Sequence, residues 1–298
     1  MGGSSYDVSV GTADSGRSYS TGSARTFSGT TQADSTVVPD KTTKLSTDVK
    51  HPVVVALDVT GSMGDSARIM YDKMPMFWGQ IEQQGYLTDP ALSFCCVGDV
   101  FSDRAPLQVT PFEKAKAIHP WLKKLWLEGG GGGTMQESYD MAAAFYVNQC
   151  DIPNAVKPFF FFIGDEGYYP MTDGFPNDVV FQGLMEKFEV FHIHWPYCGS
   201  RYTQQDEAIV AQWRTLMAER FLLLPDPKAI VDTMLGLIAM VCESRTLDEY
   251  IQDMKDRGQS EERIETVTTT IKGYTESLAA KSKPLGKKVK AKTKKAKK

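Results

Sequence analysis

The sequence predicts an α/β fold: a doubly wound, mostly parallel six-stranded sheet with one antiparallel edge strand. Between residues 49 and 244, apolar runs rich in Val, Ile and Phe alternate with stretches of helical length, an alternation typical of a parallel sheet. The runs contain few polar residues, which indicates strands buried on both faces. One pair of strands is joined by a turn too short for a crossover helix, so that pair is predicted to be antiparallel.

Six strands and six helices are expected in this region. The strands are residues 53–58, 91–97, 107–111, 159–163, 190–195 and 221–224. The helices are residues 65–84, 113–127, 136–149, 179–187, 207–218 and 229–242. Pro75 is expected to bend the first helix, because proline removes a backbone donor. The short turn at residues 103–106 makes the second and third strands antiparallel neighbours.

The flanking segments differ in composition from this domain at residues 49–244. Residues 1–48 are rich in Ser, Thr and Gly and are predicted to be disordered, because they hold too little apolar surface to offset the entropy of ordering. Short runs at residues 36–38 and 45–47 are candidates for an edge strand. Residues 245–280 are expected to form polar helices whose narrow apolar stripe either packs back on the domain or pairs with a partner helix.

The last segment, residues 281–298, is predicted to be a disordered tail. It carries ten lysines and no acidic residue, whereas the chain as a whole has a net charge of −4. The rest of the chain is therefore near −14. Such a tail is either a solvated end or a site for nucleic acid or another polyanion, bound without sequence preference.

Composition argues against a secreted or membrane protein. No stretch near 18 apolar residues and no signal peptide is found. The five cysteines are expected to be reduced, which agrees with a cytoplasmic location, and they form no C-x-x-C pair of the kind zinc sites use. They are Cys95, Cys96, Cys150, Cys198 and Cys242.

Polar residues follow the first strand directly where it ends. Asp58, Thr60 and Ser62 place three small oxygen-bearing side chains within five residues. In open α/β sheets, ligands bind outside the carboxyl ends of the strands. Hard divalent cations take oxygen ligands, few of which are carboxylates in magnesium sites. The sequence therefore predicts a divalent cation site after the first strand.

The pattern Asp-x-Thr-x-Ser, followed by Met63, resembles the metal-ion-dependent adhesion site of von Willebrand factor type A domains. That family also places a threonine after a glycine-rich loop, and here Thr134 follows five glycines at residues 129–133. It places an aspartate after a later hydrophobic strand, and here Asp165 follows residues 159–164. Two residues depart from the family pattern: Thr60 stands where serine is commoner, and Glu166 adds a negative charge.

The resemblance implies a cation site and a binding function rather than catalysis. The implied ligands are Asp58, Thr60, Ser62, Thr134 and Asp165. Mg²⁺ or Mn²⁺ held there would capture a carboxylate of a protein partner, with Thr134 joining in one conformation. Intracellular members of the family often serve as scaffolds or as partners of AAA-type ATPases, which implies a role in assembling a complex.

Other interpretations stay open at this point. Ser62 or Asp65 could simply cap the following helix. Asp58 with Thr60 also resembles the nucleophile loop of haloacid-dehalogenase-type phosphatases, with Asp165 and Glu166 as the magnesium pair, although no lysine stands at a strand end to complete that site. A third alternative is a polyanion-binding structural protein that acts through the lysine-rich tail.

Histidines and aromatic residues near the predicted strand ends allow two interpretations. His192 and His194 lie on one face of a strand by the two-residue period. They are either hydrogen-bonded core residues or, with Cys198 nearby, metal ligands. Tyr168, Tyr169 and Trp195 lie on the same edge of the sheet, where exposed aromatic side chains favour protein recognition.

Overall fold

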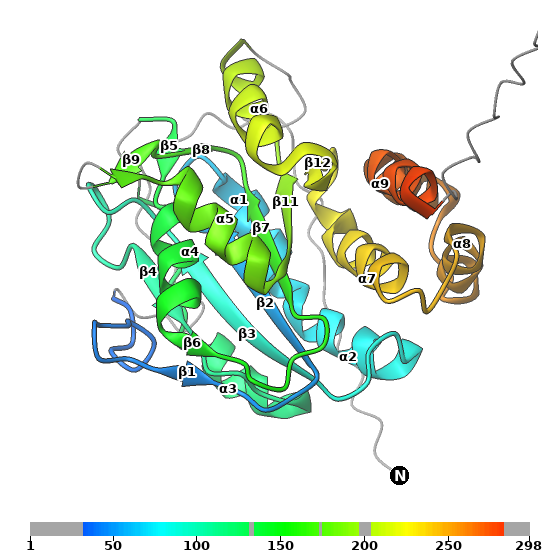
Figure 1. Cartoon of the computed structure of the whole chain (residues 1–298), viewed down its shortest axis with the longest axis horizontal. Helices are drawn as coiled ribbons and strands as arrows, with labels where there is room; N and C mark the ends of the chain where they lie inside the picture. The colour runs from blue at the N-terminus through cyan, green and yellow to red at the C-terminus, as the bar shows by residue number, and fades with distance from the viewer. Residues whose placement is uncertain (1–31, 131–133, 173–174, 197–203, 283–298) are drawn as a thin grey trace, which may run out of the picture.

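The computed structural model describes residues 32–130, 134–172, 175–196 and 204–282 (Figure 1). Its main sheet has six strands in the order β12-β11-β7-β2-β3-β4. All neighbours are parallel except β3 and β4, which are antiparallel. The predicted fold class is therefore confirmed. The strands are β2 (His51–Asp58), β3 (Pro90–Val97), β4 (Leu107–Val109), β7 (Phe159–Gly164), β11 (Glu189–His194) and β12 (Phe221–Leu223).

Helices cover both faces of the sheet (Figure 1). One face is covered by α1 (Gly64–Asp72), α2 (Met74–Gln84) and α7 (Ile230–Val241). The other is covered by α4 (Tyr139–Asn148), α5 (Asp178–Lys187) and α6 (Gln204–Met217). Successive residues of a strand point to opposite faces. Val53 and Val55 accordingly join the first core cluster, and Val54 joins the second.

The order in which strands are added reverses at the centre of the sheet. β2 lies between β3 and β7, and its residue Leu57 pairs with Ile163 of β7. From β2 the chain proceeds to β3 and β4 on one side, then crosses to β7, β11 and β12 on the other. Such a switch point leaves a crevice at the carboxyl ends of the two central strands. Asp58 ends β2 and Asp165 follows β7 directly, so both lie at this place.

Three short strand pairs surround the main sheet. They are β1 (Leu45–Ser46) with β6 (Cys150–Asp151), β5 (Gln136–Glu137) with β8 (Gly167–Tyr168), and β9 (Met171–Thr172) with β10 (Phe175–Pro176). The β5–β8 pair holds the segment after the glycine run against the segment after Asp165. The helix predicted for residues 136–149 therefore begins only at Tyr139, because the two residues before Ser138 pair as a strand.

The predicted helix at residues 113–127 is wrong. Only a 3-10 turn, η1 (Ala115–Ile118), and the short α3 (His119–Leu122) form there. Glu113 instead bridges to Leu92, with two backbone hydrogen bonds of 2.9 Å, and Ala115 has a positive φ of 49°. Pairing with the edge of the sheet therefore outweighs the helical pattern at the start of this segment.

The predicted helix at residues 65–84 is present but interrupted. α1 ends at Asp72 and α2 begins at Met74, with Pro75 in the first turn of α2. Proline fits the first turn of a helix, where its missing N–H has no intrahelical acceptor. Pro75 thus marks a helix start rather than a bend.

Residues 32–48 pack on the domain, contrary to the expectation of disorder for this part of the first segment. Val37 is 1% exposed, and its carbonyl oxygen accepts a hydrogen bond from the Val109 amide at 2.6 Å. Leu45 and Ser46 form the edge strand β1 beside β6. A few apolar residues are enough here because the sheet edge and the end of α4 supply partners. Residues 1–31 lie outside the described residues.

The C-terminal helices α8 (Leu247–Asp256) and α9 (Glu261–Ser282) pack back on the domain, mainly against α7 (Figure 1). Their buried apolar side chains join the first core cluster, and they are Tyr250, Met254, Val267, Ile271 and Tyr274. Two further 3-10 turns are η2 (Ala218–Arg220) and η3 (Pro227–Ala229). No helix within the described ranges is long and apolar enough to cross a membrane. The lysine-rich residues 283–298 lie outside those ranges.

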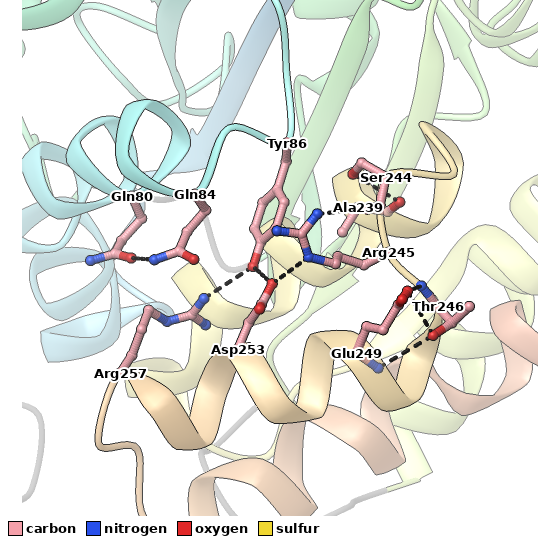
Figure 2. A network of polar contacts seen from close by, with 10 residues as sticks. All are labelled: Gln80, Gln84, Tyr86, Ala239, Ser244, Arg245, Thr246, Glu249, Asp253 and Arg257. Atoms are coloured by element: carbon pink, nitrogen blue, oxygen red, sulfur yellow. Dashed lines mark hydrogen bonds and ion pairs between the residues drawn. The ribbon is translucent and has the colours of Figure 1, made fainter.

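Polar contacts fix α8 against the segment after α2 (Figure 2). The Asp253 carboxylate accepts hydrogen bonds from the Tyr86 hydroxyl at 2.7 Å and from Arg245 Nε at 2.9 Å. Arg257 donates to the Tyr86 hydroxyl at 3.2 Å and to the buried Asp232 of α7 at 3.0 Å. These contacts join the segment after α2 to α7 and α8, which lie far from it in the sequence.

Candidate metal centre

Four of the five predicted ligands form one connected group at the switch point. The Thr60 amide and hydroxyl donate to Asp58 Oδ1, at 2.9 and 2.6 Å. The Ser62 hydroxyl donates to Asp165 Oδ1 at 3.0 Å. Thr60 Oγ and Ser62 Oγ lie 3.1 Å apart. The loop after β2 and the end of β7 thus bring two carboxylates and two hydroxyls together.

The two hydroxyl oxygens lie close to each other as well as to the two carboxylates. If Thr60 donates to Asp58 and Ser62 donates to Asp165, both hydroxyl protons are in use. The lone pairs of the two oxygens then face each other across 3.1 Å. A cation bound by both oxygens would make this close approach favourable. In an octahedral magnesium site with ligands about 2.1 Å from the ion, neighbouring oxygens lie about 3.0 Å apart, so the observed spacing fits.

Asp165 has a further oxygen that could bind a cation. Its side chain is fully buried, and its Oδ2 has no hydrogen-bond partner among the described residues. A buried carboxylate oxygen without a partner is costly. Within the described part of the chain, no group of three His, Cys, Asp or Glu side chains could hold a metal alone. A cation here therefore depends on the hydroxyls of Thr60 and Ser62 together with the carboxylates.

The centre is rich in buried carboxyl groups. Burial raises the pKa of Asp58, against the hydrogen bonds from Thr60 and Tyr139. Burial, then Asp58 and Glu166, raises the pKa of Asp165 well above its usual value. Burial and Asp58 raise the pKa of Glu166 to about 7. No lysine, arginine or histidine in the described ranges forms an ion pair with any of these carboxylates. A bound divalent cation would supply the missing positive charge.

Glu137 is a further buried carboxyl group near Asp58 and Glu166, and no sequence motif indicated it. It is 2% exposed, and its Oε2 has no partner among the described residues. Burial, then the charges of Asp58 and Glu166, raises its pKa to about 11. The pairing of β5 with β8 places it there, and nothing in the local sequence predicts that pairing.

Thr134 lies apart from this group. It is exposed, its hydroxyl donates to the Gln136 carbonyl at 2.9 Å, and it lies 3.2 Å from the Tyr169 hydroxyl. Tyr169 in turn donates to Asp99 at 2.9 Å. No contact among the described residues joins Thr134 to Ser62 or to the two aspartates, so its role as a ligand stays a prediction. Asp99 comes two residues after the end of β3, and no sequence motif indicated it.

The start of the glycine run packs against the loop after β2. The Gly61 amide donates to the Gly130 carbonyl, and the Gly129 amide donates to the Val59 carbonyl at 3.0 Å. A Cβ at Gly61 would lie 2.9 Å from the Gly130 oxygen, closer than real side chains come. Glycine at position 61 thus permits the approach of the two loops. Residues 131–133 lie outside the described residues.

The helix-cap interpretation of this loop is not supported. α1 begins at Gly64, and no side chain caps its N-terminus. The Ser62 hydroxyl donates to Asp165 instead. The Thr60 and Ser62 hydroxyls therefore contact Asp58 and Asp165 rather than the N-terminus of α1.

The two histidines are core residues, but without the expected hydrogen bonds. His192 and His194 are fully buried, and all four ring nitrogens lack a partner among the described residues. The His192 ring stacks on Trp213 with 3.9 Å between centroids. Burial lowers both pKa values, that of His194 to about 3. Cys198, the third group considered for a metal, lies outside the described residues.

Comparisons with known proteins give remote structural similarity. No protein-family model and no curated protein matches the sequence. Among solved structures, the chain is similar to proximal thread matrix protein 1 of the mussel byssus, at 13% identity and a TM-score of 0.47, over 65% of this chain and 49% of that one. Another structure of the mussel protein has zinc in its metal-ion-dependent adhesion site motif.

Two bacterial structures are similar to the same extent. The open conformation of the pilus adhesin SpaC from Lactobacillus rhamnosus GG has 10% identity and a TM-score of 0.48, over 68% of this chain and 31% of the adhesin. A von Willebrand factor type A protein from Catenulispora acidiphila has 15% identity and a TM-score of 0.42, over 64% and 42%. The chain thus spans less than half the length of each. By its own strand order and β3–β4 hairpin, it has a von Willebrand factor type A-like α/β fold.

Proposed function

We propose that this chain is a protein-binding module that depends on a divalent cation. Asp58, Thr60, Ser62 and Asp165 would hold Mg²⁺ or Mn²⁺, and the cation would capture a carboxylate from a protein partner. The observation that carries the proposal is the pair of hydroxyl oxygens 3.1 Å apart, each within hydrogen-bonding distance of a buried carboxylate. The cation supplies an electrophilic position open to an anionic oxygen.

An exposed apolar rim on the segments that follow β3 and β7 supports a protein partner. It consists of Val100, Phe101, Met171 and Phe175, which are 45, 77, 55 and 73% exposed. Phe101 packs edge-on against Tyr169, with 5.1 Å between ring centroids, and Tyr169 contacts Thr134. Exposed aromatic side chains gathered at one place are typical of protein-recognition surfaces. The sequence placed this role on Tyr168, Tyr169 and Trp195, but Tyr168 is buried and the other two are half-buried.

The phosphatase alternative has less support. A nucleophilic aspartate must present a free oxygen to phosphate. Both side-chain oxygens of Asp58 accept hydrogen bonds, from Thr60 and from Tyr139, and the side chain is fully buried. Those contacts favour a fixed charge over a nucleophile.

The test of the proposed function is retention of partners on the immobilised full-length chain. Proteins from cells that express the chain are applied in Mg²⁺ and in EDTA, to the wild type and to Asp58→Ala. We expect a specific partner that is retained only by the wild type in Mg²⁺. Phe101→Ala should lower recovery of that partner at least severalfold, with no change in the stabilisation by Mg²⁺.

Two results would contradict this proposal. One is a set of retained proteins that is the same in Mg²⁺ and EDTA. The other is hydrolysis of a generic phosphate ester that Asp58→Ala abolishes, which would favour the phosphatase. Thermal melts of each variant in EDTA serve as the control for folding.

A further inference from the structure

Tyr139 lies directly beneath the candidate centre and has no role in the function proposed above. It is the first residue of α4 and is fully buried. Its ring meets the rings of Phe162, His192 and Trp213 edge-on, with centroids 5.7, 5.8 and 5.3 Å away. Close packing on several sides leaves such a ring one orientation. The hydroxyl is therefore held at a fixed point.

That hydroxyl donates to the carboxylate at the centre. Tyr139 Oη lies 2.7 Å from Asp58 Oδ2, while Thr60 occupies Oδ1 through its amide and its hydroxyl. Three donors on two oxygens fix both the position and the plane of the Asp58 carboxylate. Hydrogen bonds to an ionised acceptor are among the stronger ones in proteins.

Gly164 leaves the space for this contact. A Cβ at position 164 would overlap the Tyr139 hydroxyl and lie 2.8 Å from Asp58 Cβ. The glycine before Asp165 thus lets β7 pass close to the end of β2 while a tyrosine hydroxyl reaches between them. Glycine in a strand interior often marks such a close approach.

We propose that Tyr139 is a positioning residue of the cation centre, which holds the Asp58 carboxylate in the orientation that the cation needs. This inference rests on the proposed function, since it assumes a cation at Asp58. Side chains that orient metal ligands through hydrogen bonds commonly change metal affinity tenfold or more when they are replaced. Tyr139 is suited to this role because packing, rather than solvent, fixes its hydroxyl.

The test compares two buried tyrosines of the same helix. Tyr139→Phe removes one hydroxyl and keeps the ring. Tyr146→Phe is the matched control: Tyr146 is also fully buried in α4, and its hydroxyl lies 2.7 Å from Ser93 Oγ, in contact with none of the four ligands. Mg²⁺ and Mn²⁺ affinities of the full-length proteins are measured by calorimetry, with thermal melts in EDTA to compare their folding.

We expect Tyr139→Phe to weaken metal binding about tenfold or more. Tyr146→Phe should bind metal as the wild type does, although both variants lose one buried hydrogen bond and melt at lower temperature in EDTA. Wild-type affinity in Tyr139→Phe, or an equal loss in both variants, would overturn the inference alone. A wild-type chain that binds neither cation would overturn the proposed function and this inference together.

Discussion

A chain that ends at Ser244 is expected to lose its cooperative fold, because residues 245–282 cover α7. All twelve residues of α7 are buried, and α8 and α9 cover one side of it. The five buried apolar side chains of these two helices, Tyr250, Met254, Val267, Ile271 and Tyr274, each contribute about 1.5–3 kcal/mol. Their sum, about 10 kcal/mol, is comparable to the whole stability of a typical domain, about 5–15 kcal/mol.

Thermal melts followed by circular dichroism, with limited proteolysis, measure this effect. The control ends at Ser282, so that it removes only residues 283–298 and keeps both helices. We expect the control to melt like the full chain and the shorter chain to show no cooperative transition. A chain of residues 1–244 that melts cooperatively near the wild-type temperature would show that α8 and α9 are dispensable additions.

Asp165→Asn is expected to abolish stabilisation by divalent cations and to stabilise the metal-free protein. The substitution removes a buried carboxyl group whose ionised form is disfavoured by burial, Asp58 and Glu166, and which has no ion pair within the described residues. Relief of such a charge is worth about 1–3 kcal/mol, or roughly 3–10 °C in Tm. The same substitution removes a carboxylate that the cation needs, so the two effects have opposite signs.

The effect on the metal-free protein should depend on pH. The folded-state pKa of Asp165 is raised above its unfolded value. The contribution of the Asp165 side chain to the free energy of unfolding is therefore full below about pH 4, and it is lost as pH rises toward the folded pKa. The advantage of Asp165→Asn in EDTA should therefore grow with pH above 4. An advantage that is constant with pH, or a variant that still responds to Mg²⁺, would contradict this account.

Asp140→Asn is the matched control for this experiment. Asp140 is also a buried carboxylate with one oxygen that lacks a partner among the described residues, and burial raises its pKa. Its other oxygen accepts from Thr172 at 2.7 Å, and it contacts none of the four ligands. Its substitution should leave the response to Mg²⁺ intact.

The sequence predicted the parts of the molecule that depend on continuous apolar runs. Runs such as residues 53–57 and 159–163 are short and apolar throughout, which is typical of strands buried on both faces. The resemblance to von Willebrand factor type A domains implied the proximity of Asp58 and Asp165, which agrees with the meeting of parallel carboxyl ends at one edge of the sheet.

The remaining features arise from contacts between distant segments. The helix predicted at residues 113–127 is wrong because the backbone of Glu113 pairs with Leu92 of β3. This pairing depends on a strand that is distant in the sequence. Val37 is buried because β4 passes beside it, whereas Val38, the next residue, is 40% exposed. Tyr139 had no local signal at all, since a tyrosine at the start of a helix looks the same whether or not its hydroxyl meets a carboxylate.

The most direct test of the central claim is calorimetric titration of the wild-type chain with Mg²⁺ and Mn²⁺, with thermal melts over the same concentrations. A cation that binds only the folded state must raise Tm with its concentration. We predict one site per chain, a Tm that increases through the millimolar range, and neither effect in Asp58→Ala. Equal melting temperatures in EDTA and in about 10 mM of either cation, with no heat of binding, would contradict a cation site at Asp58, Thr60, Ser62 and Asp165.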